Sequence, residues 1–239
     1  MKLMYDGAIS VIPIQGVGEI IANQNLADAI LECYEPDDYD VLVVTQKVVS
    51  KAEGRIVKLK LDEDVRAQIE TLVYSESRRI LRRRGDLIIT ETNSGYICAN
   101  AGIDKSNVTS GEVSLLPLNP DRSARRIRDR IKAKTSKTVG VIVSDTFGRA
   151  WRNGVCDVAL GVAGIAAIVD LRGTNDAYGQ KLEVTEIALA DEIAAAAELV
   201  KPKAGNIPAI IVRGIPKVHF RESSIQDEVI RAYSSDLFR

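Results

Sequence analysis

The sequence contains few of the residues on which most metal and nucleophilic sites depend. It has a single histidine, His219, and three cysteines, Cys33, Cys98 and Cys156, which are far apart and form no C-x-x-C spacing. Metal sites built on histidines, and a catalytic triad that involves two of them, are therefore excluded or strained. We expect the cysteines to be reduced, small buried residues of a cytoplasmic protein. Any chemistry is then expected to rest on carboxylates, lysine and a bound metal.

Long apolar runs and an excess of one charge are also missing. No apolar run approaches the roughly 20 residues that a membrane-spanning helix needs, and the first residues are too weakly apolar for a secretory signal. Lysine and arginine together number 32 against 33 aspartates and glutamates, so the formal net charge is -1. This balance argues against a broad nucleic-acid or membrane surface, but it leaves room for a local basic pocket.

What is present is the ordinary composition of a globular protein. Hydrophobic residues make up 46% of the 239 positions and charged residues 27%, a balance typical of globular domains. A chain of this length buries a sizeable core as one large domain or two small ones. We expect a single domain over residues 1–239, either undivided or built of two intertwined subdomains.

Residues 138–154 (TVGVIVSDTFGRAWRNG) form the most informative stretch of the chain. Their apolar, β-branched start predicts a buried strand, which is expected to stop at Asp145 and Thr146. A carboxylate and a hydroxyl would then stand at the carboxyl end of a strand, where mixed α and β folds often bind ligands. Such oxygen atoms suit magnesium or manganese that bridges to substrate phosphates. An ordinary turn begun by Asp145 accounts for the same residues.

Polar loops follow two other predicted strands. A strand over residues 9–14 leads into a loop with two glycines, which lets the backbone approach a ligand or simply turns the chain toward a helix. A strand over residues 40–45 leads into residues 46–55, where Lys51 has a polar, turn-like setting. A lysine in this place is either a solvated side chain or a point charge for a nucleotide phosphate.

A hairpin is predicted from residues 86–92 and 96–99, with an Asn-Ser-Gly turn between them. The segment after it, NAGIDKSN (100–107), is rich in small and oxygen-bearing residues. Asp104 in this segment is a candidate metal ligand, and Asn107 is a candidate hydrogen-bonding group. A loop closed by its own Asx hydrogen bonds is the alternative.

Apolar residues at helical spacing predict four longer helices. The first would end in an arginine-rich turn before Gly85, which is either a normal basic helix end or a basic rim for an anionic substrate. These arginines are Arg78, Arg79, Arg82, Arg83 and Arg84. The predicted helices cover residues 61–84, 123–134, 186–200 and 225–233, and a further buried strand covers residues 207–213.

Three motifs, in this order along the chain, carry a resemblance to a known family. They are SKAEGR (50–55), NAGIDKSN (100–107) and SDTFGR (144–149), and the segments ADEIAAAAELV and IPAIIVRG nearer the C-terminus fit the same pattern. The chain resembles the coenzyme F-420-0:gamma-glutamyl ligases over essentially its whole length. The resemblance implies an α+β fold of mixed sheets with packed helices, not a P-loop or Rossmann fold, and a homodimer. The absence of a G-x-x-x-x-G-K-[ST] motif agrees with it.

The resemblance implies a GTP-dependent ligase of coenzyme F-420 biosynthesis. Such an enzyme joins L-glutamate to coenzyme F-420-0 in amide linkage through an acyl phosphate, and further gamma-linked glutamates can follow. Phosphoryl transfer depends on positioning and charge neutralisation, so no histidine base is required. The implied cofactors are two divalent metal ions, magnesium or manganese. A potassium requirement and the choice of GTP over ATP stay open.

Site residues follow from the resemblance by matched position. Asp104 and Asp145 would bind a divalent metal, and Thr146 would contact a second one. Lys51 would act with these two aspartates in catalysis and would contact GTP, as would Asn107. Less securely matched positions that touch nucleotide in relatives are Val17, Gly18, Glu19, Ile20 and Gln46.

The sequence also departs from the family pattern. In the loop over residues 200–206, where relatives hold GTP, Pro202 stands where some relatives place Glu or Gln on the second metal. The protein's share of that metal site is therefore left open. Some bacterial relatives carry a second, nitroreductase-like domain, and only the ligase part is expected here.

Charge alone suggests which groups hold the carboxylates of the acid substrate. Arg149, Arg152 or the cluster over residues 78–84 are the candidates, and their replacement would raise the KM for F-420-0 without abolishing nucleotide binding. Two other functions stay open. One is a related metal-dependent amide ligase that acts on a different acid, and the other is a GTP-binding regulator that has lost the chemistry.

Overall fold

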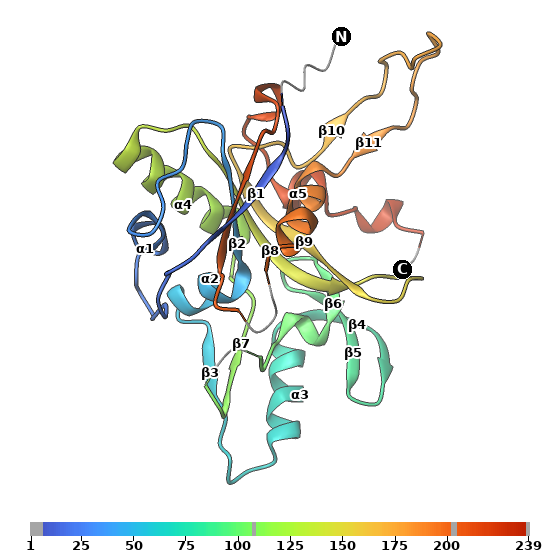
Figure 1. Cartoon of the computed structure of the whole chain (residues 1–239). Coiled ribbons are helices and arrows are strands. Elements are labelled where there is room, and N and C mark those ends of the chain that lie inside the picture. The colour runs from blue at the N-terminus through green and yellow to red at the C-terminus, as the bar shows by residue number, and fades with distance from the viewer. Residues whose placement is uncertain (1–6, 107–108, 202–204, 238–239) are drawn as a thin grey trace.

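The computed structural model describes residues 7–106, 109–201 and 205–237 (Figure 1). Its centre is a five-stranded sheet in the order β1-β12-β2-β8-β9. Only β2 and β8 run parallel, and the other neighbouring pairs are antiparallel. The strands are β1 (Ser10–Ile14), β12 (Ala209–Arg213), β2 (Val41–Thr45), β8 (Gly140–Gly148) and β9 (Val155–Ala163).

Helices cover both faces of this sheet (Figure 1). Val41 and Val43 of β2 face α5 (Leu189–Glu198) and α6 (Ile225–Glu228). Leu42 and Val44 face the opposite layer of α1 (Leu26–Leu31), α2 (Gln46–Ala52) and α4 (Pro120–Thr135). Burial on both faces explains why β2 is a continuous apolar run rather than an alternating one.

A smaller unit lies below the central sheet in Figure 1. The antiparallel strands β4 (Ser77–Arg84), β5 (Leu87–Thr92) and β6 (Ile97–Ala99) pack with α3 (Val65–Ser75) around a small core of Val73, Ile88 and Ala101. Beside it lies the short pair β3 (Ile56–Lys58) and β7 (Glu112–Ser114). The pair β10 (Val169–Asp170) and β11 (Glu186–Ile187) begins a projecting arm.

A β-bulge distorts the β8–β9 hairpin beside the carboxyl end of β2. Val143 pairs with Gly161 and Ser144 with Ala159, so Leu160 is the extra residue. The hydroxyl of Tyr96, in the turn between β5 and β6, donates to the Leu160 carbonyl. The bulge therefore links the two sheets, and bulges commonly redirect side chains near functional sites.

The structure confirms the α+β class, the hairpin at residues 86–99, the strand near residues 9–14 and the buried strands near residues 40–45 and 207–213. Among the described residues, no helix combines the length and the apolar character that crossing a bilayer would take.

Five sequence predictions are wrong at the level of elements. The helix predicted over residues 61–84 ends at Ser75, because residues 77–84 pair with β5 around the Gly85 turn. The helix predicted over residues 186–200 starts at Leu189, because the two residues of β11 pair with β10.

The last predicted helix, over residues 225–233, stops at Glu228 and is followed by a short 3-10 helix, Tyr233–Ser235. The strand expected to stop at Asp145 continues to Gly148, because β9 pairs with it through that residue. Lys51 is also not in a turn, since it belongs to α2. Strand pairing explains the errors in the helices predicted over residues 61–84 and 186–200 and in the strand that continues to Gly148.

Candidate active site

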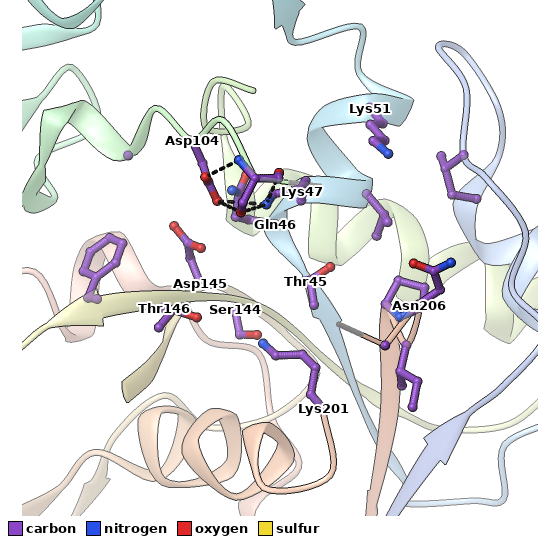
Figure 2. Close-up of a pocket in the computed structure, with 18 of the residues that line it drawn as sticks. Thr45, Gln46, Lys47, Lys51, Asp104, Ser144, Asp145, Thr146, Lys201 and Asn206 are labelled. Atoms are coloured by element: carbon purple, nitrogen blue, oxygen red, sulfur yellow. Dashed lines mark hydrogen bonds and ion pairs between the residues drawn. The ribbon is translucent and has the colours of Figure 1, made fainter. Parts of the chain in front are cut away.

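A cavity of about 610 Å³ opens at the carboxyl end of β2 (Figure 2). This volume is in the usual range for a small-molecule site. The first turns of α2, the residues of β8 beyond the bulge, and three loops (17–20, 98–106 and 205–208) form its walls. Every described residue predicted for the site lines it: Val17, Gly18, Glu19, Ile20, Gln46, Lys51, Asp104, Asp145 and Thr146. Asn107 lies outside the described residues.

Asp104 is held in place by two residues that donate hydrogen bonds to it. The Lys47 ammonium lies 2.8 Å from Oδ2, and Ser106 donates its backbone N–H to Oδ1 at 2.7 Å and its hydroxyl to Oδ2 at 2.8 Å. Burial pushes the pKa of Asp104 up, but the hydrogen bonds from Lys47 and Ser106 outweigh it, so the pKa lies below its ordinary value. Asp104 is therefore a carboxylate at neutral pH.

Asp145 points from β8 toward Asp104 and Lys47 (Figure 2). Burial raises the pKa of Asp145 to about 7, and the negative charges of Asp157 and Asp104 act in the same direction. Several carboxylates in a partly buried place repel one another unless a cation joins them. The electrostatics therefore favour binding of a positive ion beside Asp145.

Thr146 and Ser144 turn toward a third carboxylate, that of Asp157 on β9. Thr146 donates its hydroxyl to Oδ1 at 2.6 Å and Ser144 donates to Oδ2 at 3.1 Å. The Lys201 ammonium also forms an ion pair with Oδ2, and Figure 2 shows the lysine pointing toward Ser144.

Two of the residues predicted to contact the nucleotide, Gln46 and Lys51, lie on α2. Gln46 is 1% exposed; its Oε1 accepts the Ser50 hydroxyl at 2.9 Å, but no described group accepts a hydrogen bond from its Nε2. A buried donor without a partner is costly, so a ligand acceptor is expected there. Lys51 pairs with Glu19 at 2.5 Å and lies apart from Asp104 (Figure 2).

Sequence reasoning missed three residues of this region: Lys47, Asp157 and Lys201. Lys47 directly follows a predicted site residue, so its position was a usable signal. Asp157 is an acidic residue inside the apolar strand VCDVALGVA, which is a weaker signal. Lys201 meets Asp157 only because the end of α5 lies against β9.

The cysteines are not all where the sequence suggested, and the candidate arginines lie outside the cavity. The cysteines are not all buried, since Cys33 is exposed and Cys156 is half-buried. Cys98 does line the cavity, but burial raises the pKa of its thiol to about 12, so it is not a nucleophile at neutral pH. None of the arginines of β4, nor Arg149 or Arg152, lines the cavity.

The oxygen donors of the site fit a hard divalent cation. Asp104, Asp145 and Thr146 offer two carboxylates and a hydroxyl, the ligand types that magnesium and manganese prefer. The described residues contain no cluster of three or more histidine, cysteine or acidic side chains placed to hold a metal. A metal with only one or two protein carboxylates commonly completes its shell with water and substrate phosphates.

Comparisons with known proteins agree with this geometry. The family profile described as F420-0:Gamma-glutamyl ligase matches residues 16–214. The coenzyme F420:L-glutamate ligase of Methanothermobacter thermautotrophicus is 38% identical over an alignment of 252 positions, which covers 97% of this chain and 99% of the relative. The enzyme of the same name from Archaeoglobus fulgidus is 39% identical over an alignment of 244 positions, which covers 97% of this chain and 96% of the relative. Since both the profile and the relatives cover most of the chain, the protein is an enzyme of the F420-0:gamma-glutamyl ligase family.

Proposed function

We propose that this enzyme joins L-glutamate to coenzyme F420-0 in amide linkage, and that GTP hydrolysis to GDP and phosphate drives the reaction. The names of the relatives support the acid and the amine. The observation that carries the proposal is that one cavity gathers Asp104, Asp145, Thr146 and Lys51, four residues of three separate motifs. The homodimer that the resemblance implies belongs to the same proposal.

The proposed reaction must first activate a carboxylate, because oxide is a poor leaving group. A carboxylate oxygen of F420-0 attacks the γ-phosphorus of GTP, and the bond from that phosphorus to the bridging oxygen of GDP breaks. The amine of L-glutamate then attacks the acyl carbon, and phosphate departs with the oxygen that came from the carboxylate. The amine loses its proton to solvent or to the departing phosphate.

The side chains of the cavity promote these reaction steps by placing positive charge beside the phosphates and the reacting carboxylate. Divalent cations, one held by Asp104 and Asp145 and a second contacted by Thr146, would neutralise the negative charge of the phosphates and the reacting carboxylate. Lys47 holds Asp104 in place with Ser106. Lys51 supplies a positive charge on α2 that can meet a phosphate. Phosphoryl transfer depends mainly on such positioning and electrostatics, so the chain's single histidine is not needed.

Gln46 and the loop over residues 17–20 are proposed to hold the nucleotide. Gln46 lines the cavity, and its Nε2 is a buried donor without an acceptor among the described residues, so a small shift of this side chain would let it recognise a base carbonyl or a phosphate oxygen. Glu19, which pairs with Lys51 in this structure, would release the ammonium when a more strongly charged phosphate arrives.

The proposal is tested by leaving out one component at a time. Phosphate release is followed with GTP, Mn²⁺, L-glutamate and F420-0, and the product mass is measured. We expect phosphate only when all four are present, together with a mass gain of one glutamate residue. Release that needs GTP and glutamate but a different acid would favour a related amide ligase. GTP binding without any turnover would overturn the proposal in favour of a regulator.

The acyl phosphate is tested separately with isotope. F420-0 labelled with ¹⁸O in its terminal carboxylate should yield phosphate that carries one ¹⁸O atom per amide formed. Unlabelled phosphate would contradict transfer of the phosphoryl group to the acid.

A further inference from the structure

Asp157 is not among the residues that line the cavity, and it has no part in the function proposed so far. Asp157 is 1% exposed, yet its carboxylate meets three side chains, those of Ser144, Thr146 and Lys201. A buried charge is retained only where partners compensate it. The arrangement is therefore a built network rather than a surface ion pair.

The fold ties Asp157 to both sides of the cavity. Asp157 and Thr146 are register partners in the β8–β9 ladder, so the carboxylate stands directly beside the hydroxyl. The backbone N–H of Asp157 donates to Glu198 Oε2 at 2.9 Å, at the last residue of α5. Lys201 follows shortly after this helix, and its ammonium forms an ion pair with the Asp157 carboxylate. Asp157 thus links β8 to the segment that carries Lys201.

These contacts make the Thr146 oxygen an acceptor toward a ligand and fix the position of the Lys201 ammonium. A threonine hydroxyl has one proton, and here that proton is donated to Asp157. Toward other groups the oxygen of Thr146 therefore acts as an acceptor, which is the property that a cation requires. The Lys201 side chain is 13% exposed, so its ammonium is held in one place at the cavity wall.

We propose that Asp157 is a positioning residue of the active site, which fixes the Thr146 oxygen as a contact for a divalent cation and the Lys201 ammonium as a positive charge for the triphosphate. This inference rests on the function proposed above. Asp157 itself touches neither ligand and acts only through these two side chains.

The test is Asp157→Asn, which keeps the size of the side chain but removes its charge and one acceptor oxygen. Mn²⁺ affinity is measured from the electron paramagnetic resonance signal of free Mn²⁺, with a nonhydrolysable GTP analogue present, and analogue affinity is measured by calorimetry. Removing an outer partner of a metal ligand typically costs about 10–100-fold in metal affinity, and we expect a loss in this range.

Asp191→Asn is the matched control. Asp191 also accepts a backbone N–H of β9, from Ala159 at 2.9 Å, but it does not line the cavity. We expect this variant to lower the melting temperature and to leave both affinities unchanged. Equal losses of affinity in the two variants, or no loss in Asp157→Asn, would overturn the inference.

A second variant keeps the test decisive if Asp157→Asn does not fold. Thr146→Val replaces the hydroxyl with a methyl group and should by itself reproduce the loss of Mn²⁺ affinity. Where both single variants fold, the double variant should bind no more weakly than the worse single one, because the two residues act through each other. Unchanged Mn²⁺ affinity in Thr146→Val, or additive losses, would overturn the inference. Failure of the unmodified protein to bind Mn²⁺ and the analogue would instead overturn the proposed function, and this inference with it.

Discussion

Gln46 illustrates at the scale of one residue how a binding site costs stability. It is buried, and its Nε2 has no acceptor among the described residues. Leaving such a donor unpaired costs about 1–3 kcal/mol of folding free energy. A ligand that supplies an acceptor would recover part of this cost.

We therefore predict opposite effects of Gln46→Met on binding and on stability. The substitution keeps the length of the side chain but removes the donor together with Oε1, and the Ser50 hydroxyl that Oε1 accepted keeps the Leu115 carbonyl as its acceptor at 2.7 Å. A nonhydrolysable GTP analogue should bind about tenfold more weakly, since one lost hydrogen bond is worth about 1.4 kcal/mol. The free energy of unfolding, measured by urea denaturation, should stay the same or rise. Unchanged analogue affinity together with lower stability would show that Gln46 is only structural.

His219 gives a second prediction at this scale, because it is the only histidine. Burial lowers the pKa of His219 below its ordinary value of 6.5, so below that pH the unfolded chain binds this proton more tightly than the folded protein. The contribution to stability is therefore present above pH 6.5 and is lost as the pH falls through the depressed folded pKa. Urea unfolding at pH 7.5 and 5.5 should show a smaller decrease for His219→Asn than for the unmodified protein. An equal decrease in both would contradict the prediction.

At the scale of elements, the outer edge of β9 is covered rather than exposed. Three of its backbone N–H groups donate to carboxylates: that of Val162 to Asp121, that of Ala159 to Asp191 and that of Asp157 to Glu198. Exposed strand edges invite pairing with other chains. Here side chains of α4 and α5 fill that role and also fix the strand that carries Asp157.

Close contact between β9 and α4 depends on Gly161. A Cβ atom at this position would lie 2.2 Å from the carbonyl carbon of Pro120 and 2.6 Å from the backbone nitrogen of Asp121. Gly161→Ala should therefore lower the free energy of unfolding by about 1–3 kcal/mol, the usual cost of overpacking, and more if α4 cannot move. Gly148→Ala, on β8 of the same hairpin with no atom within 4 Å of its Cβ, is the matched control. Equal thermal or urea stability of the two variants would contradict this account.

At the scale of the whole molecule, the local sequence pattern predicted the buried strands of the core, but it did not predict strands that form only by pairing with another strand. The strands around Val43 and Ile211 could be predicted because their apolar runs are short and bounded by polar residues. The arginine-rich β4 could not, since only pairing with β5 makes residues 77–84 extended. Propensity is a weak guide where such tertiary pairing decides the structure.

The same distinction applies to the site. The matched motifs predicted Asp104, Asp145 and Thr146, and the fold brings them into one cavity. Asp157 and Lys201 escaped prediction because their contacts arise from strand register and from the position of α5. Residues that act through a neighbouring element leave little trace in a single sequence.

The most direct test of the central claim is the mass of the product formed by the unmodified enzyme, by Asp145→Asn and by the control Asp191→Asn. Each protein is incubated with GTP, Mn²⁺, L-glutamate and F420-0. We predict a mass gain of one glutamate residue, or of successive residues, with the unmodified enzyme and with Asp191→Asn, and none with folded Asp145→Asn. The same product from Asp145→Asn at the same rate, or no product from the unmodified enzyme, would contradict the assignment of this cavity as the ligase active site.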